Sequence, residues 1–379
     1  MRVAVIGAGI VGASVAFRLA RGGARVWLID GGRPGGGTTS ASFAWVNANQ
    51  KLPRDYFDLN HTGMEEHLRL HKELGGAPWL HPTGNLIWTT DKARQEDLEA
   101  WVERLSSWGY AAEWRTAAEV NRYLEPNLKL SSPDLPVAYF PKEAWVDAPQ
   151  LAGALVRLAT DGGAELRFRA AVDSIQTRAG RVSGVHLDGG ESIPVDTVVN
   201  AAGPGADRVA ALLDLPLPMA PSSGLLARLA VEGDPLGRLA HGDRVNLRPD
   251  GSGHLLAHHE SVDQKLRDGT DDPQSLGEEL LGRAREVLPV LRNARVIETR
   301  TGVRSIPEDG RSCVGAVSAV PGYYESVTHS GVTLGPLIGE LLTKEILTGE
   351  VDPLISPFRP DRFTRTTSES EGTTDEEQK

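Results

Sequence analysis

Hydrophobic and polar positions along the chain follow two different periods, which predicts a mixed α/β fold. The first apolar run, residues 3–6, is continuous, as in a strand that is buried on both faces. Residues 14–21 then place apolar side chains at helical spacing, and glycines at 22 and 23 end that pattern. Residues 24–30 predict a second buried strand, which ends in Asp30. The opening of the chain therefore predicts a strand, a helix and a second strand.

Similar patterns extend over the rest of the chain. Helices are predicted at 55–76, at 91–108, from 116 to the residue before Pro126, from about 147, and from about 276 to 287. Strands are predicted at 84–90, 166–175, 180–187, 196–206, 224–231, 244–251 and 253–259, and residues 323–349 predict a final strand, turn and helix. Segments typical of a nucleotide-binding domain therefore lie at both ends and in the middle of the chain. A second unit, with strands in a meander-like order, is inserted between them.

The turn between the first strand and the first helix contains three glycines in the order G-x-G-x-x-G. Gly7 permits the tight turn, Gly9 lets the backbone approach a pyrophosphate, and Gly12 lets helix and strand pack closely. The helix N-terminus offers N–H groups and a partial positive charge to phosphates. Asp30, at the end of the second strand, would accept hydrogen bonds from ribose hydroxyls and repel a 2′-phosphate. The pattern predicts a dinucleotide site and leaves FAD and NAD open.

The segment after Asp30 is too long and too rich in glycine for a simple connection. Its small and hydroxylated residues, among them Ser40 and Ser42, suit a backbone that lies against a flat cofactor. Residues 43–46 are apolar, which indicates that part of the segment is buried.

A histidine pair raises the question of a metal site. His67 and His71 lie four residues apart on one face of a predicted helix. No third ligand stands at metal-site spacing, so we expect both to be surface side chains.

Composition and charge narrow the class of partner. The chain has 379 residues and a formal net charge of −11, which argues against nucleic-acid binding. No apolar stretch approaches the roughly 20 residues of a membrane span, and the first residues show no signal-peptide pattern. The single cysteine, Cys313, excludes an internal disulfide and fits a reducing compartment, so we expect a cytoplasmic protein. Residues 364–379 are acidic and lack apolar periodicity, which predicts a disordered tail.

Several short motifs, in their order and spacing, resemble one family. They are the glycine turn, TTSASFAWVNANQ at 38–50, YLEPNL at 123–128, WVDAPQL at 145–151, VVNAAGPGA at 198–206, RPDGSGHLLA at 248–257, TGVRSIPEDGRSCVG at 301–315 and THSGVTLGPLIGELL at 328–342. The chain resembles the FAD-dependent D-amino acid oxidase family, which includes glycine oxidase, sarcosine oxidase and D-amino acid dehydrogenase. The resemblance implies a Rossmann-type FAD-binding domain at 1–78, 145–217 and 301–363. An inserted antiparallel-sheet substrate domain would occupy 79–144 and 218–300.

The resemblance also implies the cofactor and the residues that hold it. Some sarcosine oxidases tether the flavin through a cysteine near the position of Arg304, and Cys313 lies well downstream, so we expect non-covalent FAD. The residues implied at the FAD are Gly7, Gly9, Ile10, Val11, Gly12, Asp30, Gly31, Ser40, Ser42, Val172, Ala202, Gly203, Ser330, Gly331, Val332 and Thr333. The last of these begin a predicted helix, whose N–H groups would face the flavin's pyrimidine edge, where reduced flavin carries negative charge.

Three residues are implied at the substrate. Arg304 matches the arginine that binds the substrate carboxylate in several relatives, and its planar guanidinium can hold both carboxylate oxygens. A structural salt bridge is the alternative for this residue. His258 and His259 lie on a strand that lines the substrate cavity in relatives, and the alternative is that both are exposed histidines at a strand end.

We therefore expect an enzyme that oxidises the C–N bond of a small amino acid or N-alkyl amino acid. A hydride would pass to FAD, and water would hydrolyse the resulting imine. Two alternatives stay open: flavin-dependent oxidation of a hydroxy acid or polyol, and a flavin-binding protein without turnover. The sequence does not determine the identity or chirality of the substrate, the electron acceptor or the oligomeric state.

Overall fold

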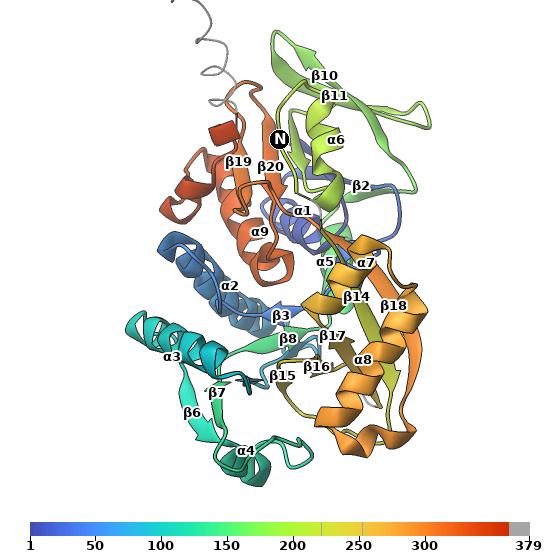
Figure 1. Ribbon diagram of the computed structural model, residues 1–379. Helices are drawn as coiled ribbons and strands as arrows, with labels where there is room; N and C mark the ends of the chain where they lie inside the picture. Colours follow the sequence, from blue (N-terminus) through green and yellow to red (C-terminus); the bar gives the residue numbers. More distant parts are fainter. Residues whose placement is uncertain (221, 252, 364–379) are drawn as a thin grey trace, which may run out of the picture.

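Two large sheets organise the protein. The computed structural model describes residues 1–220, 222–251 and 253–363; the tail 364–379 lies outside them, so its disorder stays a prediction. A six-stranded sheet occupies the upper half of Figure 1 and an eight-stranded sheet the lower half. The first sheet is largely parallel and the second largely antiparallel, which is the mixed α/β architecture that the sequence predicts.

The six-stranded sheet runs in the order β19-β20-β13-β1-β2-β9. Its strands are β1 Arg2–Ile6, β2 Arg25–Asp30, β9 Glu165–Phe168, β13 Thr197–Asn200, β19 Cys313–Ala316 and β20 Tyr323–Val327. Neighbours pair in parallel except β19 and β20. Along β1, Val3 and Val5 belong to one core while Ala4 and Ile6 belong to another. Burial on both faces explains why the first apolar run is continuous.

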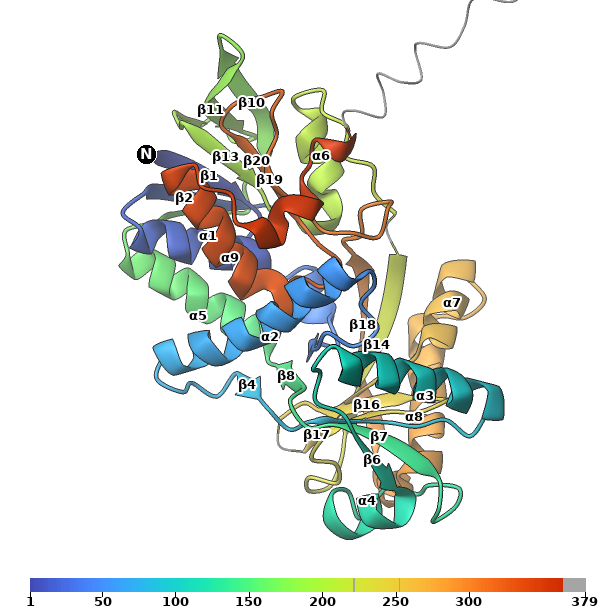
Figure 2. The same cartoon turned by 90° about the vertical axis from the view of Figure 1, so that its left-hand side faces the viewer.

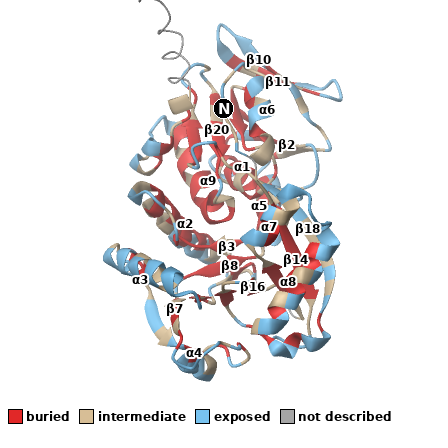
Figure 3. Ribbon diagram, in the orientation of Figure 1, coloured by how far each residue is buried: buried red, intermediate tan, exposed pale blue. Residues whose placement is uncertain are grey.

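Helices cover one face of this sheet and a smaller sheet covers the other. α1 Ile10–Arg21 packs between α5 Ala148–Asp161 and α9 Gly331–Thr348. Figure 3 shows α9 and β20 among the buried elements of this half. The opposite face packs against β10 Val172–Arg178, β11 Arg181–Leu187 and β12 Ser192–Ile193. The short helix α6 Ala206–Ala211 follows β13 through the turn η2 Gly203–Gly205.

The eight-stranded sheet runs in the order β18-β14-β17-β16-β15-β5-β7-β6. Its strands are β5 Asn85–Ile87, β6 Glu113–Thr116, β7 Pro136–Phe140, β14 Ser222–Ala230, β15 Leu239–His241, β16 Asn246–Pro249, β17 His254–His258 and β18 Arg295–Arg304. The neighbours are antiparallel except β15 and β5, which are parallel. Helix α8 Pro273–Val287 buries Leu276 and Leu280 in the core of this sheet, and η3 Pro289–Asn293 follows it.

Helix α2 Arg54–Glu73 lies between the two halves, with α9 on one side and α3 Lys92–Ser107 on the other (Figure 2). A small sheet of β3 Trp45–Val46, β4 Leu80–His81 and β8 Ala144–Val146 lies beside it, and α4 Ala117–Tyr123 follows β6. The turns η1 Thr38–Ala41 and η4 Pro353–Phe358 complete the structure. None of the helices in the described part of the chain is long and apolar enough to cross a bilayer.

Most predicted elements are confirmed, but one predicted strand is wrong, and the strand predicted at 196–206 ends at Asn200 as β13. The helices predicted at 55–76, 91–108, 116–125, from 147 and at 276–287 are α2, α3, α4, α5 and α8. The single strand predicted over 166–175 is two strands in two different sheets, because Arg169 has a positive φ of 57° and turns the chain between β9 and β10.

The expectation that His67 lies on the surface is also wrong. Its side chain is fully buried between α2 and α9, and its ring packs near Trp79. Its Nε2 lies 2.7 Å from the carbonyl oxygen of Val332 and donates a hydrogen bond to it. This bond fastens α2 to the first turn of α9. The helical spacing predicted that His67 and His71 share one face of a helix, but it did not predict that α9 covers His67.

Candidate active site

The glycine turn between β1 and α1 has two positions where a side chain would overlap the backbone and one, Gly9, where it would meet another side chain. Gly7 has a φ of 106°, and a Cβ there would overlap the carbonyl oxygen of Ala201. A Cβ at Gly12 would overlap the carbonyl oxygen of Gly7. At Gly9 a Cβ would meet one described atom within 4 Å, Thr39 Oγ1 at 3.2 Å. The nearest neighbour at Gly9 is therefore a side-chain oxygen rather than backbone, and the sequence predicts a pyrophosphate at this position.

Asp30 ties the end of β2 to this turn. Its two carboxylate oxygens accept hydrogen bonds from the backbone N–H groups of Ala8 and Gly32, each at 2.6 Å. These bonds hold the glycine turn against the loop that begins at Gly31. The predicted role toward a ribose stays a prediction, and a structural role is now added to it.

The other residues implied at the cofactor come from separate segments. Val172 begins β10, Ala202 and Gly203 follow β13, and residues 330–333 begin α9. The ends of β1, β2 and β13 lie at the same edge of the six-stranded sheet because these strands are parallel. Ligands bind at such an edge in open α/β sheets. Ser40 lies in η1, where its hydroxyl donates to the carbonyl oxygens of Gly36 and Gly37.

The shape of this edge fits FAD. Helix α1 begins after Gly9 and α9 after Ser330, and neither N-terminus is closed by a hydrogen bond from its own N-cap side chain. A cavity of about 1170 Å³ is lined by Ser42 and by Ser330, Val332 and Thr333 at the α9 end. A second cavity of about 630 Å³ is lined by residues 33–38, Ser40 and Pro204. The N–H of Ile10 at the start of α1 donates to Thr39 Oγ1 at 3.1 Å. The remaining N–H groups of the first turn of α1 and the N-terminus of α9, along small residues, suit a ligand with a pyrophosphate and a flavin.

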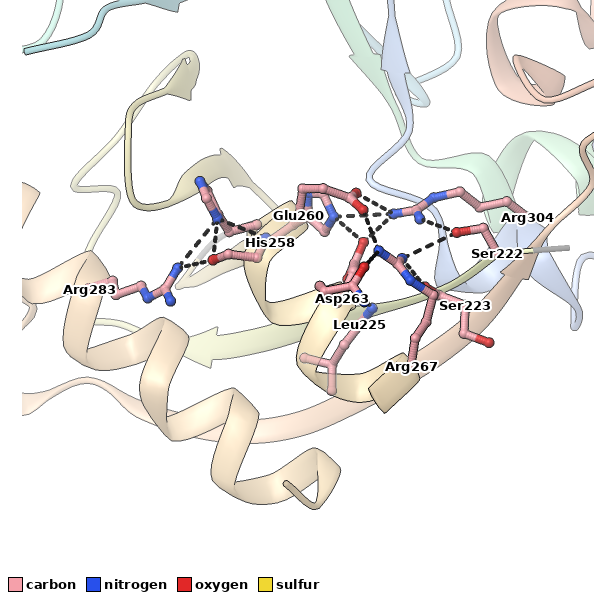
Figure 4. Close-up of polar contacts among 12 residues, drawn as sticks. Ser222, Ser223, Leu225, His258, Glu260, Asp263, Arg267, Arg283 and Arg304 are labelled. Atoms are coloured by element: carbon pink, nitrogen blue, oxygen red, sulfur yellow. Dashed lines mark hydrogen bonds and ion pairs between the residues drawn. The ribbon is translucent and has the colours of Figure 1, made fainter. Parts of the chain in front are cut away.

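Arg304 lies in the larger cavity, at the end of β18, and forms an ion pair with Asp263 (Figure 4). The Asp263 side chain is fully buried, while the Arg304 side chain is 24% exposed. Arg304 also donates to Ser222 Oγ at 3.3 Å, and its guanidinium lies 3.9 Å from the Glu260 carboxylate. The salt bridge that the sequence offered as an alternative is therefore present, and the guanidinium still faces the cavity.

Asp263 is held as an anion by its neighbours. Burial alone would raise its pKa, but hydrogen bonds from His258, from the Leu225 N–H and from Arg304 outweigh burial and lower the pKa. The Nε2 of His258 lies 2.9 Å from one carboxylate oxygen, and the Leu225 N–H lies 2.7 Å from the other. His258 therefore donates its Nε2–H to Asp263, and this N–H is not available to a ligand.

His259 directly follows the last residue of β17, the strand on which the sequence places it. It is the N-cap of α7 Glu260–Asp268, a helix that the sequence did not predict, and its ring accepts the backbone N–H of Ser261 at 3.2 Å. Its ring also lines the larger cavity. Burial lowers its pKa, with the charge of Arg283 as the next cause. Acidic residues at the start of α7 and Gly269 after its end are the signals that could have revealed this helix and, on it, Asp263.

Three further residues of the larger cavity escaped the prediction: Lys51, His241 and His329. Burial lowers the pKa of Lys51 to about 8, although the charge of Glu143 opposes the change. Burial also lowers the pKa of His329 to about 4, with smaller contributions from Lys51 and Arg304. His329 lies within the motif at 328–342 and Lys51 directly follows the motif at 38–50, whereas His241 lies in none of the motifs. The cavity collects all three from distant segments.

Cys313 is buried and unpaired in β19, where burial raises the pKa of its thiol. It is absent from the described residues that line the two cavities. Cys313 is therefore a small core residue.

Comparison with known proteins identifies relatives over nearly the whole chain. A family model described as FAD dependent oxidoreductase matches residues 2–345. Glycine oxidase of Pseudomonas putida is 28% identical over 373 residues, covering 94% of this chain and 96% of the relative. Glycine oxidase of Bacillus licheniformis is 26% identical over 368 residues, with coverage of 94% and 96%.

Solved structures show the same fold. Iminodiacetate oxidase from Chelativorans sp. BNC1 has a TM-score of 0.81 at 27% identity, covering 95% of this chain and 99% of that chain. Glycine oxidase from Geobacillus kaustophilus has a TM-score of 0.84 at 24% identity, with coverage of 95% and 99%. These matches confirm the predicted fold class, and the family match confirms FAD as the cofactor and the protein as an enzyme. The chain belongs to the family of FAD-dependent oxidoreductases that contains glycine oxidase.

Proposed function

We propose that the protein oxidises the C–N bond of a small amino acid or N-alkyl amino acid. One observation carries this proposal: a single cavity is lined both by Arg304 and by the first turn of α9, at Ser330 to Thr333. A carboxylate held by Arg304 would place the neighbouring carbon and nitrogen close to the ring expected at α9. The relatives named for glycine and iminodiacetate support an amino acid as the substrate class.

Each side chain has a separate task in this proposal. Arg304 binds the substrate carboxylate, and Asp263 holds the guanidinium in place through its own ion pair. FAD, when bound, accepts the hydride from the carbon beside the substrate nitrogen, and water then hydrolyses the imine. The N–H groups at the start of α9 would face the flavin pyrimidine, where negative charge develops on reduction. His258 supports Asp263, and His259 lines the cavity.

The remaining expectations become part of the same proposal. Gly9, Asp30, Ser42, Val172, Ala202 and the other residues implied at the cofactor would bind FAD without a covalent tether. Residues 1–78, 145–217 and 301–363 would form the FAD-binding domain, and 79–144 and 218–300 the substrate domain. We also propose a cytoplasmic location, because the single cysteine is buried as a free thiol.

Anaerobic mixing with substrates tests the proposal directly. Glycine, sarcosine, iminodiacetate and both alanine enantiomers are added to the flavin-loaded protein, and the loss of flavin absorbance is followed. We expect at least one of these amines to bleach the flavin and to yield an oxo acid. Bleaching by glycolate or glycerol, with none by any amine, would favour the hydroxy-acid or polyol alternative. A flavin that no compound reduces would point to a binding protein without turnover.

A further inference from the structure

A fully buried carboxylate lies behind the wall of the larger cavity. Glu143, between β7 and β8, accepts four hydrogen bonds from side chains. Its Oε1 accepts from Tyr110 Oη at 2.7 Å and from Asn49 Nδ2 at 3.3 Å. Its Oε2 accepts from Trp45 Nε1 at 2.7 Å and from Asn85 Nδ2 at 2.9 Å. Burial raises the pKa of Glu143 to about 7 against the effect of these donors.

The direction of these bonds is fixed by two indole rings, which can only donate. The indole of Trp45 donates directly to Glu143. The indole of Trp101 donates to Asn49 Oδ1 at 2.7 Å, so the amide nitrogen of Asn49 must face Glu143. Both carboxylate oxygens are therefore acceptors in this network. When Glu143 is ionised, all of its neighbours must donate, so Asn85 points its amide nitrogen at Glu143 and its amide oxygen away from it.

The amide oxygen of Asn85 faces a histidine of the cavity. Asn85 Oδ1 lies 2.7 Å from Nδ1 of His241, so Nδ1 must carry the proton of the ring. Burial lowers the pKa of His241 to about 3, with the charge of His258 as a second cause, so the ring stays neutral near pH 7. A neutral ring with its proton on Nδ1 has an unprotonated Nε2. The hydrogen bonds that run from the ionised Glu143 through Asn85 to His241 thus select one tautomer of His241.

His241 lies where the two halves of the molecule meet. It ends β15 of the eight-stranded sheet, and its ring packs against Trp45 at 4.3 Å and Phe43 at 5.6 Å between ring centroids. The carbonyl oxygen of Trp45 accepts a hydrogen bond from Thr333 Oγ1 in the first turn of α9. His241 lines the same cavity as Arg304. The cavity therefore contains a guanidinium that suits a carboxylate and a ring nitrogen that suits a hydrogen-bond donor.

We propose that Nε2 of His241 accepts a hydrogen bond from the amino group of the substrate, and that Asn85 and Glu143 are positioning residues that fix its tautomer. This inference rests on the proposed function. A substrate nitrogen must be unprotonated to lose a hydride from its neighbouring carbon. A neutral primary or secondary amine keeps an N–H for His241, whereas a neutral tertiary amine has none. The structure thus favours primary and secondary amino acids as the substrate class.

Nitrogen NMR of histidine-labelled holoenzyme tests the tautomer without any turnover. The signals of His241 are assigned from their absence in His241→Gln. We expect a proton on Nδ1 and none on Nε2 above pH 7, where Glu143 is ionised. In Asn85→Leu, which removes the acceptor at Nδ1, we expect the His241 signals to move toward a mixture of tautomers. A wild-type ring with its proton on Nε2 would overturn the inference, and this result needs no active variant.

A matched pair of substrates tests the hydrogen bond itself. Sarcosine keeps one N–H in its neutral form and N,N-dimethylglycine keeps none, so the ratio of their rates of flavin reduction isolates that bond. In His241→Leu we expect the ratio to fall about 3- to 10-fold, the effect of one lost hydrogen bond. His186→Leu, on the remote strand β11, should leave the ratio unchanged. An unchanged ratio in a flavin-loaded His241→Leu protein would overturn the inference.

The two proposals fail in different ways. If no amine reduces the flavin, the proposed function is wrong and the amine assignment to His241 falls with it, whatever tautomer is found. If sarcosine reduces the flavin but the ratio is the same in wild type and His241→Leu, the proposed function stands and only the role of His241 is wrong.

Discussion

The ion pair with Asp263 changes how the role of Arg304 is interpreted. The sequence identified Arg304 through a motif and offered a carboxylate ligand and a salt bridge as alternatives. The structure places a buried carboxylate beside the guanidinium and leaves part of the guanidinium in the cavity. Arg304 has several N–H donors, so an ion pair with Asp263 leaves donors for a ligand.

Substitution of Arg304 tests its role toward the carboxylate. In Arg304→Ala we expect flavin reduction by carboxylate substrates to slow about 30-fold to several thousand-fold, the loss of about 2 to 5 kcal/mol for a desolvated charge pair. Arg304→Lys should restore only part of the rate, because an ammonium lacks the two-pronged geometry. Stopped-flow absorbance of the flavin measures both effects.

Two controls separate binding from damage to the site. A matching amine without a carboxylate should respond much less to Arg304→Ala, since it makes no ion pair. Equal losses for both compounds would indicate that the unpaired Asp263 has disturbed the site instead. Unchanged kinetics for a carboxylate substrate would remove Arg304 from the active site.

The buried thiol of Cys313 leads to a second prediction at this scale. No other cysteine exists in the chain, and Cys313 is away from both cavities among the described residues. Acid precipitation should therefore release all of the yellow colour into the supernatant. Flavin that stays with the protein pellet would show a covalent bond and contradict this expectation.

At the scale of elements, the glycine turn connects β1 to α1, and Asp30 at the end of β2 bonds both to this turn and to the loop that follows β2. Gly12 lets α1 pass close to the carbonyl oxygen of Gly7, and Asp30 holds the turn from the end of β2. Gly9 has no comparable neighbour in the described structure. The three glycines therefore have different functions, which the motif alone does not separate.

Two alanine substitutions distinguish these functions. Gly9→Ala should give a folded protein, with a free energy of unfolding of the apoprotein within about 1 kcal/mol of wild type. Its FAD affinity should be clearly weaker, because the added methyl group lies where the pyrophosphate is expected; a fluorescence titration with FAD measures this. Gly12→Ala should fail to fold, because its methyl group would overlap the backbone. Normal FAD affinity in Gly9→Ala would mean that the glycine serves packing alone.

At the scale of the whole molecule, stability depends on buried histidines as well as on the cores. His67 joins α2 to α9 and is fully buried, and burial lowers its pKa to about 4, against the opposing effect of hydrogen bonds to the carbonyl oxygens of Val332 and Thr333. The unfolded chain would bind a proton at His67 near pH 6.5. As the pH falls below 6.5, the unfolded state gains that proton first, so the folded state loses stability until the pH reaches about 4.

This linkage can be measured. We expect His67 to remove up to about 3 kcal/mol from the free energy of unfolding between pH 6.5 and pH 4. His67→Gln keeps a donor for the Val332 carbonyl oxygen but does not titrate, so its unfolding free energy should fall less over the same range. Denaturant unfolding of both proteins at several pH values provides the comparison, in which contributions of the other histidines cancel. Parallel pH profiles would contradict the prediction.

The sequence by itself determined the features that are encoded within short segments. Continuous apolar runs, helical spacing and three glycines predicted the strand–helix–strand unit, and ordered motifs predicted the family and FAD. These features follow from local periodicity and from backbone conformations that only glycine adopts easily. The prediction of a single strand over 166–175 was wrong for a related reason. The chain turns there at Arg169, and an arginine gives no local sequence signal for a turn.

Only the tertiary structure decided which distant side chains meet. Asn85 reaches Glu143 across 58 positions and His241 across 156, and Asp263 reaches Arg304 across 41. A hydrogen bond or ion pair between such residues depends on how sheets and helices pack, and no spacing in the sequence records it. Burial has the same origin, since the covering residues of His67 and Glu143 come from other elements. The tautomer of His241 and the pairing of Arg304 are therefore properties of the fold, set by contacts that form only when the chain is packed.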